Sequence, residues 1–316
     1  FGQIVILMLI QTGGLGFTTF VTILFMMIRR GGLGLYEKRA VMQTLGGKNA
    51  GVGKLVIRVV AGTFALELIG AALLSIRFIP DFGAARGIYY AVFHAVSAFC
   101  NAGFDLFGTA NETFVSLTHY ASDPLVSLTV PFLVIVGGLG FCVWGDVFDC
   151  KFRVKKFQFY TKFILLVNSV VLLSSTVLFL LFEYNNPCYE GFHFGQKLLC
   201  SFFNASTART AGFCTTDLTQ LSGSGYLLAV ILMFIGGCSG STAGGIKIST
   251  FAVIVTGMFA VLRGKREINI GKRRVDNALF SQAIAIFMAY LSIILVSVML
   301  ICMFEPQAEF QKVLFE

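Results

Sequence analysis

The chain has 316 residues, of which 56% are hydrophobic and only 13% are charged. This composition is too apolar for a soluble domain of this size, so it excludes an ordinary soluble fold and indicates an integral membrane protein. The net charge of +8 could suggest nucleic-acid binding, but the basic residues lie between hydrophobic runs, where they set orientation in the bilayer. The expected partner is therefore lipid and not nucleic acid.

Six apolar runs reach the roughly 20 residues that a helix needs to cross a bilayer, at about positions 1–28, 55–76, 125–148, 157–182, 226–262 and 279–304. Lys and Arg gather in the first, third and fifth regions between these runs, which the positive-inside rule places in the cytoplasm. The pattern predicts a multi-pass protein of the plasma membrane. The chain begins without Met inside one apolar run and stops soon after the sixth, so we expect a fragment that lacks both ends.

One loop occurs twice in the chain. The segment 93–104 (FHAVSAFCNAGF) aligns without gaps with the segment 202–213 (FFNASTARTAGF). Each ends a short segment, 88–99 or 198–208, which as a helix would cross only about half of a hydrocarbon core that is roughly 30 Å thick. We expect both to enter from outside and turn back, so that the following loops line a pore, because irregular backbone at that depth must be buried or solvated.

A pore loop selects an ion with backbone carbonyls, and aiming them at the axis requires backbone angles that glycine adopts most readily. Gly103 and Gly212 are therefore the expected centres of two filter loops. The predicted filter residues are Cys100, Asn101, Ala102, Gly103, Phe104, Thr210, Ala211, Gly212 and Phe213. Asp105 follows the first loop and either attracts cations at the outer mouth or caps the loop. Arg209 would repel a cation, so we expect it behind the filter, paired with a carboxylate or with loop carbonyls.

The fifth apolar run is overlong and contains five glycines within positions 236–247. Each glycine disfavours helix by about 1 kcal/mol relative to Ala, so we expect a break in mid-membrane. The break is either a gate below the filter or a loosely packed kink, and a phosphate-binding motif fails there by one residue. Lys247 either blocks cations or extends from a helix start. The predicted gate residues are Gly236, Gly237, Ser239, Gly240, Ser241, Thr242, Gly244, Gly245 and Lys247.

Three further features complete the reading of the residues. The motif GGLGF occurs at 13–17 and again at 137–141, and its small residues serve either close helix packing or pore lining. Glu67 lies within an apolar run, where it needs a hydrogen-bonding partner, most simply a neighbouring loop. The three histidines and eight cysteines show neither catalytic nor metal-ligand spacing, so we expect no enzyme activity and no covalently bound cofactor; His94 is read as a packing residue.

Taken together, the stretches 11–20, 97–104, 207–213 and 236–250 resemble the Ktr/Trk superfamily of potassium transport subunits. The resemblance implies an all-α integral membrane fold in which tandem M1–pore loop–M2 units surround a central ion pore with pseudo-symmetry. By this match, 1–50 holds the M2 helix of the first unit and a cytoplasmic loop. Segments 51–150 and 151–274 are the second and third units, and 275–316 begins the fourth.

The same resemblance implies bacterial potassium uptake, with K⁺ at the filter carbonyls and the glycine-rich break as an intramembrane gate. It also implies a homodimer and a cytosolic ring of nucleotide-binding, RCK-type regulatory domains, and it leaves activation by Na⁺ open. Cys100 stands where Asn is commoner in the family, and the first and fourth filters are expected outside this chain. The alternative is a secondary cation-coupled symporter with broken helices, which the parallel repeats disfavour.

Overall fold

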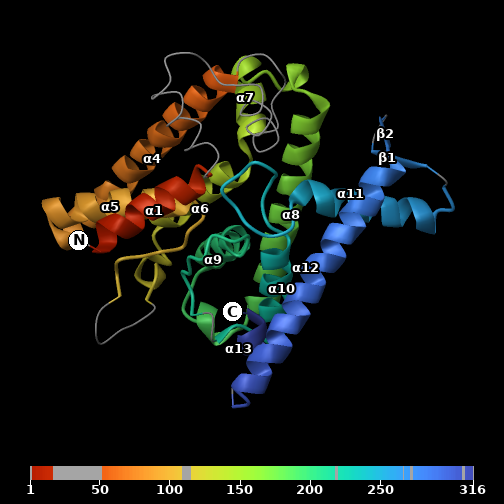
Figure 1. The fold of residues 1–316 in the computed structure, drawn as a ribbon. Helices are drawn as coiled ribbons and strands as arrows, with labels where there is room; N and C mark the ends of the chain where they lie inside the picture. The colour runs from red at the N-terminus through yellow and green to blue at the C-terminus, as the bar shows by residue number, and fades with distance from the viewer. Residues whose placement is uncertain are drawn as a thin grey trace.

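The structure is a computed structural model that describes residues 2–16, 52–108, 115–217, 220–265, 267–270, 273–307 and 310–315. The expected end of the first M2 helix and the cytoplasmic loop that follows it, at 17–51, lie outside the described residues. The described chain is almost entirely helical (Figure 1).

Eleven α-helices are described, together with three short 3₁₀ turns: α1 (Gly2–Gly14), α4 (Val52–Phe82), α5 (Ala84–Phe99), η1 (Thr118–Tyr120), α6 (Pro124–Gly138), α7 (Phe141–Asp149), η2 (Val154–Lys156), α8 (Phe159–Glu183), η3 (Pro187–Tyr189), α9 (Phe194–Thr207), α10 (Gly223–Phe234), α11 (Ile248–Leu262), α12 (Asn277–Phe304) and α13 (Phe310–Phe315). A small antiparallel hairpin, β1 (Ile268–Ile270) with β2 (Arg273–Val275), precedes α12. The sequence did not predict this hairpin, which departs from an all-α fold.

Helices α4, α8 and α12 are each long and apolar enough to cross a membrane, and they coincide with three of the six predicted spans. The predicted fifth span is divided into α10 and α11, as its glycines indicated. The predicted third span, 125–148, is not one continuous helix. It forms α6 and α7, which meet at an angle of 93°.

The bend between α6 and α7 is made by the second GGLGF motif. Gly140 has a φ of +84°, a left-handed conformation that side chains resist. A Cβ there would lie 2.6 Å from the Ser239 carbonyl oxygen, and the Phe141 amide donates to the Gly240 carbonyl at 2.8 Å. The first copy behaves alike, because α1 ends at Gly14 and Gly16 has a φ of +81°. The motif thus makes close backbone contacts at the bend, and a pore-lining role for it stays a prediction.

The two short helices after α4 and α8 fold back against the helices that precede them. Figure 1 shows α5 lying along one side of the molecule beside α1, with α9 near its centre. Phe78 of α4, Phe93 and Phe99 of α5, and Leu133 of α6 belong to one buried core cluster, which also includes Phe213 beyond α9. This shared core fixes the ends of α5 and α9 relative to each other.

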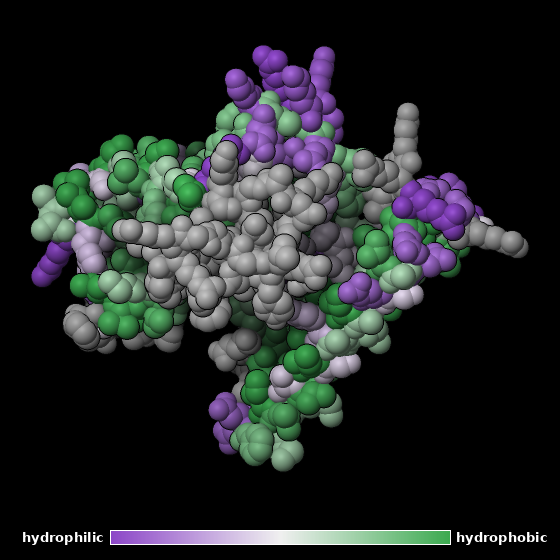
Figure 2. Space-filling model, turned by 45° about the horizontal axis from the view of Figure 1, so that its top comes forward, coloured by the Kyte–Doolittle hydropathy of each residue, from purple (hydrophilic) through white to green (hydrophobic). Residues whose placement is uncertain are grey.

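The outer surface fits a lipid environment. Of the described residues of α12, only Ala283 is buried, and the exposed apolar side chains of this helix extend along its length (Figure 2). Polar residues gather at the end of the molecule where α8 and α12 begin, near η2 and the β-hairpin. The exposed basic residues there include Lys151, Arg153, Lys155, Lys156 and Arg274. Their shared end agrees with one membrane face for both regions.

Candidate functional site

The loops that follow α5 and α9 meet at their glycines. Gly103 has a φ of +74° and Gly212 a φ of +81°. A Cβ on Gly103 would lie 2.5 Å from the Ala211 carbonyl oxygen and 2.8 Å from the Gly212 Cα, and a Cβ on Gly212 would lie 3.1 Å from the Gly103 Cα. The structure therefore brings the two predicted filter loops together, with glycine required at both positions. Their role in ion binding stays a prediction.

The loop after α5 is held by side chains of α5 itself. Ser97 Oγ donates to the Phe104 carbonyl at 2.8 Å. His94 Nδ1 donates to the Tyr90 carbonyl at 2.7 Å, which leaves Nε2 to accept the Leu106 amide at 3.4 Å. The His94 ring also stacks on Phe107 with a centroid distance of 4.4 Å. His94 therefore positions the chain that leaves the filter loop, which is more than the packing role read from the sequence.

The loop after α9 is held by the segment that precedes α6 and by α9 itself. The Cys214 amide donates to Ser116 Oγ at 3.1 Å, and the Leu117 amide donates to the Cys214 carbonyl at 2.9 Å. Asn204 Nδ2 donates to Thr216 Oγ1 at 3.0 Å. Sequence reasoning missed Ser116, because nothing local marks a serine that binds a residue about a hundred positions away.

The predicted gate residues form a loop between α10 and α11, hereafter the gate loop (236–247). Its two ends are joined, since the Gly236 amide donates to the Ile246 carbonyl at 3.1 Å and the Ile246 amide donates to the Phe234 carbonyl at 3.0 Å. A Cβ on Gly236 would lie 1.8 Å from the Gly244 carbonyl oxygen, so the backbones touch there. The Cys238 amide donates to the Gly138 carbonyl at 2.9 Å, which fastens the gate loop to the bend after α6.

The gate loop also contacts both filter loops. Thr242 Oγ1 lies 3.0 Å from the Phe99 carbonyl oxygen and 3.3 Å from Asn101 Oδ1. The Gly244 amide donates to Thr210 Oγ1 at 3.0 Å. The predicted gate and filter residues therefore form one connected site.

Lys247 lies at the start of α11, where one of the two sequence readings placed it. Its Nζ donates to the Ala243 carbonyl at 2.7 Å, and its side chain is half-buried. The ammonium group is thus held against the gate loop by a backbone carbonyl.

Two carboxyl groups flank the first filter loop. Asp105 Oδ1 accepts the Phe107 amide at 3.1 Å, so the loop-capping reading of Asp105 has a structural basis, while an outer-mouth role remains a prediction. Glu67 is buried, and Cys100 Sγ donates to its Oε1 at 3.9 Å. The expected loop partner of Glu67 is therefore the first residue of the filter loop.

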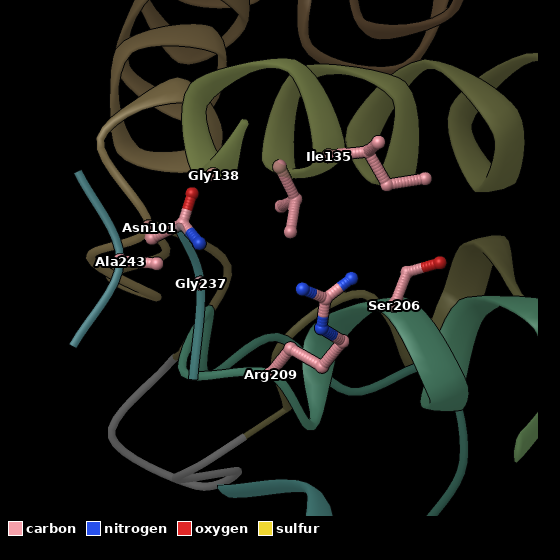
Figure 3. Close-up of a pocket in the computed structure, with 8 residues that line it drawn as sticks. Asn101, Ile135, Gly138, Ser206, Arg209, Gly237 and Ala243 are labelled. Carbon is pink, nitrogen blue, oxygen red and sulfur yellow. The ribbon is translucent and has the colours of Figure 1, made fainter. Parts of the chain in front are cut away.

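Arg209 is buried beside the gate loop, and Figure 3 shows its guanidinium group directed into a small cavity. The cavity lies between α6, the end of α9 and the gate loop, and its lining includes Asn101, Ile135, Ser206 and Ala243. In the part of the chain that the structure describes, Arg209 makes no ion pair with a carboxylate and its Nε has no hydrogen-bond partner. The expected carboxylate clamp is therefore not found there.

These features define a class of protein: a multi-pass helical membrane protein with two short helices whose glycine loops meet, beside a broken helix. The chain belongs to the TrkH family of cation transport proteins, which it matches over residues 1–316. It is thus a transport protein and not an enzyme.

Two relatives and one solved structure illustrate the match. The chain is 39% identical over 322 residues to Ktr system potassium uptake protein B of Bacillus subtilis, covering 100% of this chain and 69% of that protein. It is 37% identical over 305 residues to the potassium/sodium uptake protein NtpJ of Enterococcus hirae, covering 96% and 66%. The crystal structure of the potassium transporter TrkH from Vibrio parahaemolyticus shares the fold, with a TM-score of 0.63 at 16% identity over 84% of this chain and 55% of that chain.

Proposed function

We propose that the full-length protein takes up potassium ions across the plasma membrane through a gated pore, and that this chain supplies two of its filter loops and its gate. The contact between two left-handed glycines, Gly103 and Gly212, at the ends of two short helices carries the proposal. The names of the Bacillus subtilis and Enterococcus hirae relatives, which specify potassium and potassium/sodium uptake, support this cargo.

Two features of the loops suit a dehydrated cation. Helices α5 and α9 end at the loops, so the partly negative ends of both helix dipoles favour a positive charge there. In the described part of the chain, no hydrogen bond is donated to the carbonyl oxygens of Gly103 and Gly212. These oxygens can therefore replace water around K⁺, in the way that rings of backbone carbonyls act in potassium-selective filters.

The gate loop supplies the switch in this proposal. Its glycines make more than one backbone path accessible, and a bias of about 1.4 kcal/mol between two states changes the open fraction tenfold while the closed state predominates. Cytosolic nucleotide-binding domains of the RCK type would provide that bias by moving α11, in a homodimer of the full-length subunit. The relative named as a protein of a "Ktr system" fits a transporter with further subunits.

A cation-coupled symporter is the alternative, because α6–α7 and α10–α11 are both broken and broken helices line the sites of such transporters. Growth rescue in cells distinguishes a pore from a symporter. A strain lacking its own potassium uptake systems should grow at low K⁺ when it expresses the full-length protein with its regulatory partner. Continued rescue in sodium-free medium, with Na⁺ only accelerating uptake, supports a pore; an absolute and stoichiometric need for a second ion supports the symporter, and absence of rescue rejects both.

A further inference from the structure

The residues that the gate loop contacts occupy the same position in the two internal repeats. Asn101 and Thr210 each lie two residues before the filter glycine. Thr242 of the gate loop contacts Asn101 Oδ1, and the Gly244 amide of the gate loop donates to Thr210 Oγ1. One loop from the third unit therefore contacts equivalent side chains in two units.

Both of these residues have an unusual backbone conformation. Asn101 has a φ of +51° and Thr210 a φ of +68°. Asn tolerates the left-handed region, whereas a β-branched residue such as Thr is an outlier there. Such conformations persist where the surroundings fix them, and they concentrate at functional sites. At Thr210 the fixing group is the gate-loop amide.

The same two residues determine where the filter glycines lie. Ala102 and Ala211 separate them from Gly103 and Gly212, and a Cβ on Gly103 would lie 2.5 Å from the Ala211 carbonyl oxygen. The loops are thus in direct backbone contact, so a change of φ at Thr210 displaces the carbonyls of both loops. The geometry of the filter loops therefore depends on the side chains of Asn101 and Thr210, which the gate loop contacts.

We propose that Asn101 and Thr210 are positioning residues that couple the gate to the filter. We call the gate loop seated when it makes these contacts with Asn101 and Thr210. The seated gate loop and a bound K⁺ stabilise the same conformation of the filter loops, so loss of the contacts lowers the affinity of the filter for K⁺. By linkage, K⁺ in the filter favours the seated gate loop to the same degree. The coupling suits conduction, because an ion bound tightly while the gate is closed is bound more weakly once it opens. This inference rests on the proposed function and adds a regulatory link to it.

The test is K⁺-dependent thermal stabilisation of the purified full-length protein, with KCl replaced by NaCl or choline chloride at constant ionic strength. A ligand that binds only the folded state stabilises it by RT ln(1 + [L]/Kd), so the melting temperature measured against K⁺ concentration gives an apparent Kd. Thr210→Val removes the acceptor hydroxyl and keeps the branched side chain, and Thr242→Val removes the donor. Each should raise the apparent Kd for K⁺ about threefold to tenfold, as loss of one hydrogen bond allows.

Two further variants isolate the mechanism. Thr210→Gly also lacks the hydroxyl but adopts a positive φ without strain, so it should raise the apparent Kd for K⁺ less than Thr210→Val does. Ser75→Ala removes a hydroxyl whose described hydrogen bond is to the Ala71 carbonyl within α4, and it should behave as the wild type does. If Thr210→Val does not fold, Thr242→Val carries the test alone.

The outcomes separate this inference from the function on which it rests. A wild-type protein that K⁺ stabilises no better than Na⁺ contradicts potassium binding itself. A wild-type protein that prefers K⁺, with Thr210→Val and Thr242→Val unchanged, overturns the coupling alone. Equal impairment of Thr210→Gly and Thr210→Val also overturns it, because the held conformation would then be irrelevant.

Discussion

Serine at either filter glycine is expected to reduce the preference for K⁺ over Na⁺. Gly103 and Gly212 have positive φ values of 74° and 81°, and a residue with a Cβ resists that region by about 1–2 kcal/mol. At Gly103 the new Cβ would also approach backbone atoms of the other loop at 2.5 and 2.8 Å, whereas at Gly212 the nearest backbone atom is 3.1 Å away. Backbone cannot swing aside as a side chain can, so the loops must move apart.

The structure therefore orders the two variants. If the strain is relieved by displacing the carbonyls, about 1–2 kcal/mol of discrimination is lost, which corresponds to about fivefold to thirtyfold in the K⁺/Na⁺ ratio. Gly103→Ser should lie at the upper end of that range and Gly212→Ser at the lower end. The assay is the ratio of initial K⁺ and Na⁺ uptake rates in cells that lack their own uptake systems, normalised to the amount of full-length protein in the membrane.

Gly191 provides a matched control. It has a φ of +77°, and a Cβ there would meet no atom within 4 Å, so Gly191→Ser carries the conformational cost without the contact between loops. The control should lower stability slightly and leave the K⁺/Na⁺ ratio unchanged. Unchanged ratios in both Gly103→Ser and Gly212→Ser, or an equal loss in Gly191→Ser, would refute the reasoning.

If the Asp105 carboxylate attracts cations through its electric field, which 0.1 M salt screens over about 10 Å, Asp105→Asn should lower K⁺ uptake at low ionic strength and have little effect at high ionic strength. A defect that does not depend on salt would indicate instead that Asp105 acts through its hydrogen bond to the Phe107 amide. Deletion of residues 239–244 should raise K⁺ flux and reduce its dependence on the regulatory partner; a folded variant that still conducts only with the partner would show that the loop is not the gate. The fully buried Glu183 carboxyl accepts hydrogen bonds from Asn186 and from the Ser222 amide and hydroxyl at the start of α10. Glu183→Ala should therefore destabilise the detergent-solubilised protein by about 2–4 kcal/mol, while the preference for K⁺ over Na⁺ is retained. An unchanged melting temperature would contradict this.

Local requirements account for the parts of the site that the sequence predicted. A glycine is needed where the backbone turns left-handed at depth, so the doubled Ala-Gly-Phe located Gly103 and Gly212, which the structure places in contact. The high glycine content of 236–247 likewise predicted the break between α10 and α11. In both cases the signal lies in the residues that adopt the conformation.

The features that sequence reasoning missed depend on contacts between distant segments. The run 125–148 is predominantly apolar, and its 93° bend is stabilised by the Phe141 amide, which donates to the Gly240 carbonyl. The partner of Arg209 was expected to be a carboxylate or a carbonyl, but its guanidinium group faces a cavity shaped by α6, α9 and the gate loop. The hairpin β1–β2 lies in a strongly basic stretch whose composition indicates only a cytoplasmic loop.

The most direct measurement is ion flux into proteoliposomes that contain only the purified full-length subunit and its regulatory partner. Uptake of ⁸⁶Rb⁺, a tracer for K⁺, is followed while unlabelled KCl or NaCl is added outside at equal ionic strength. A selective pore predicts uptake that K⁺ suppresses at much lower concentration than Na⁺, and a loss of that difference in Gly103→Ser. Absence of tracer uptake, or equal suppression by K⁺ and Na⁺ in the wild-type protein, would contradict a potassium-selective pore built from these two loops.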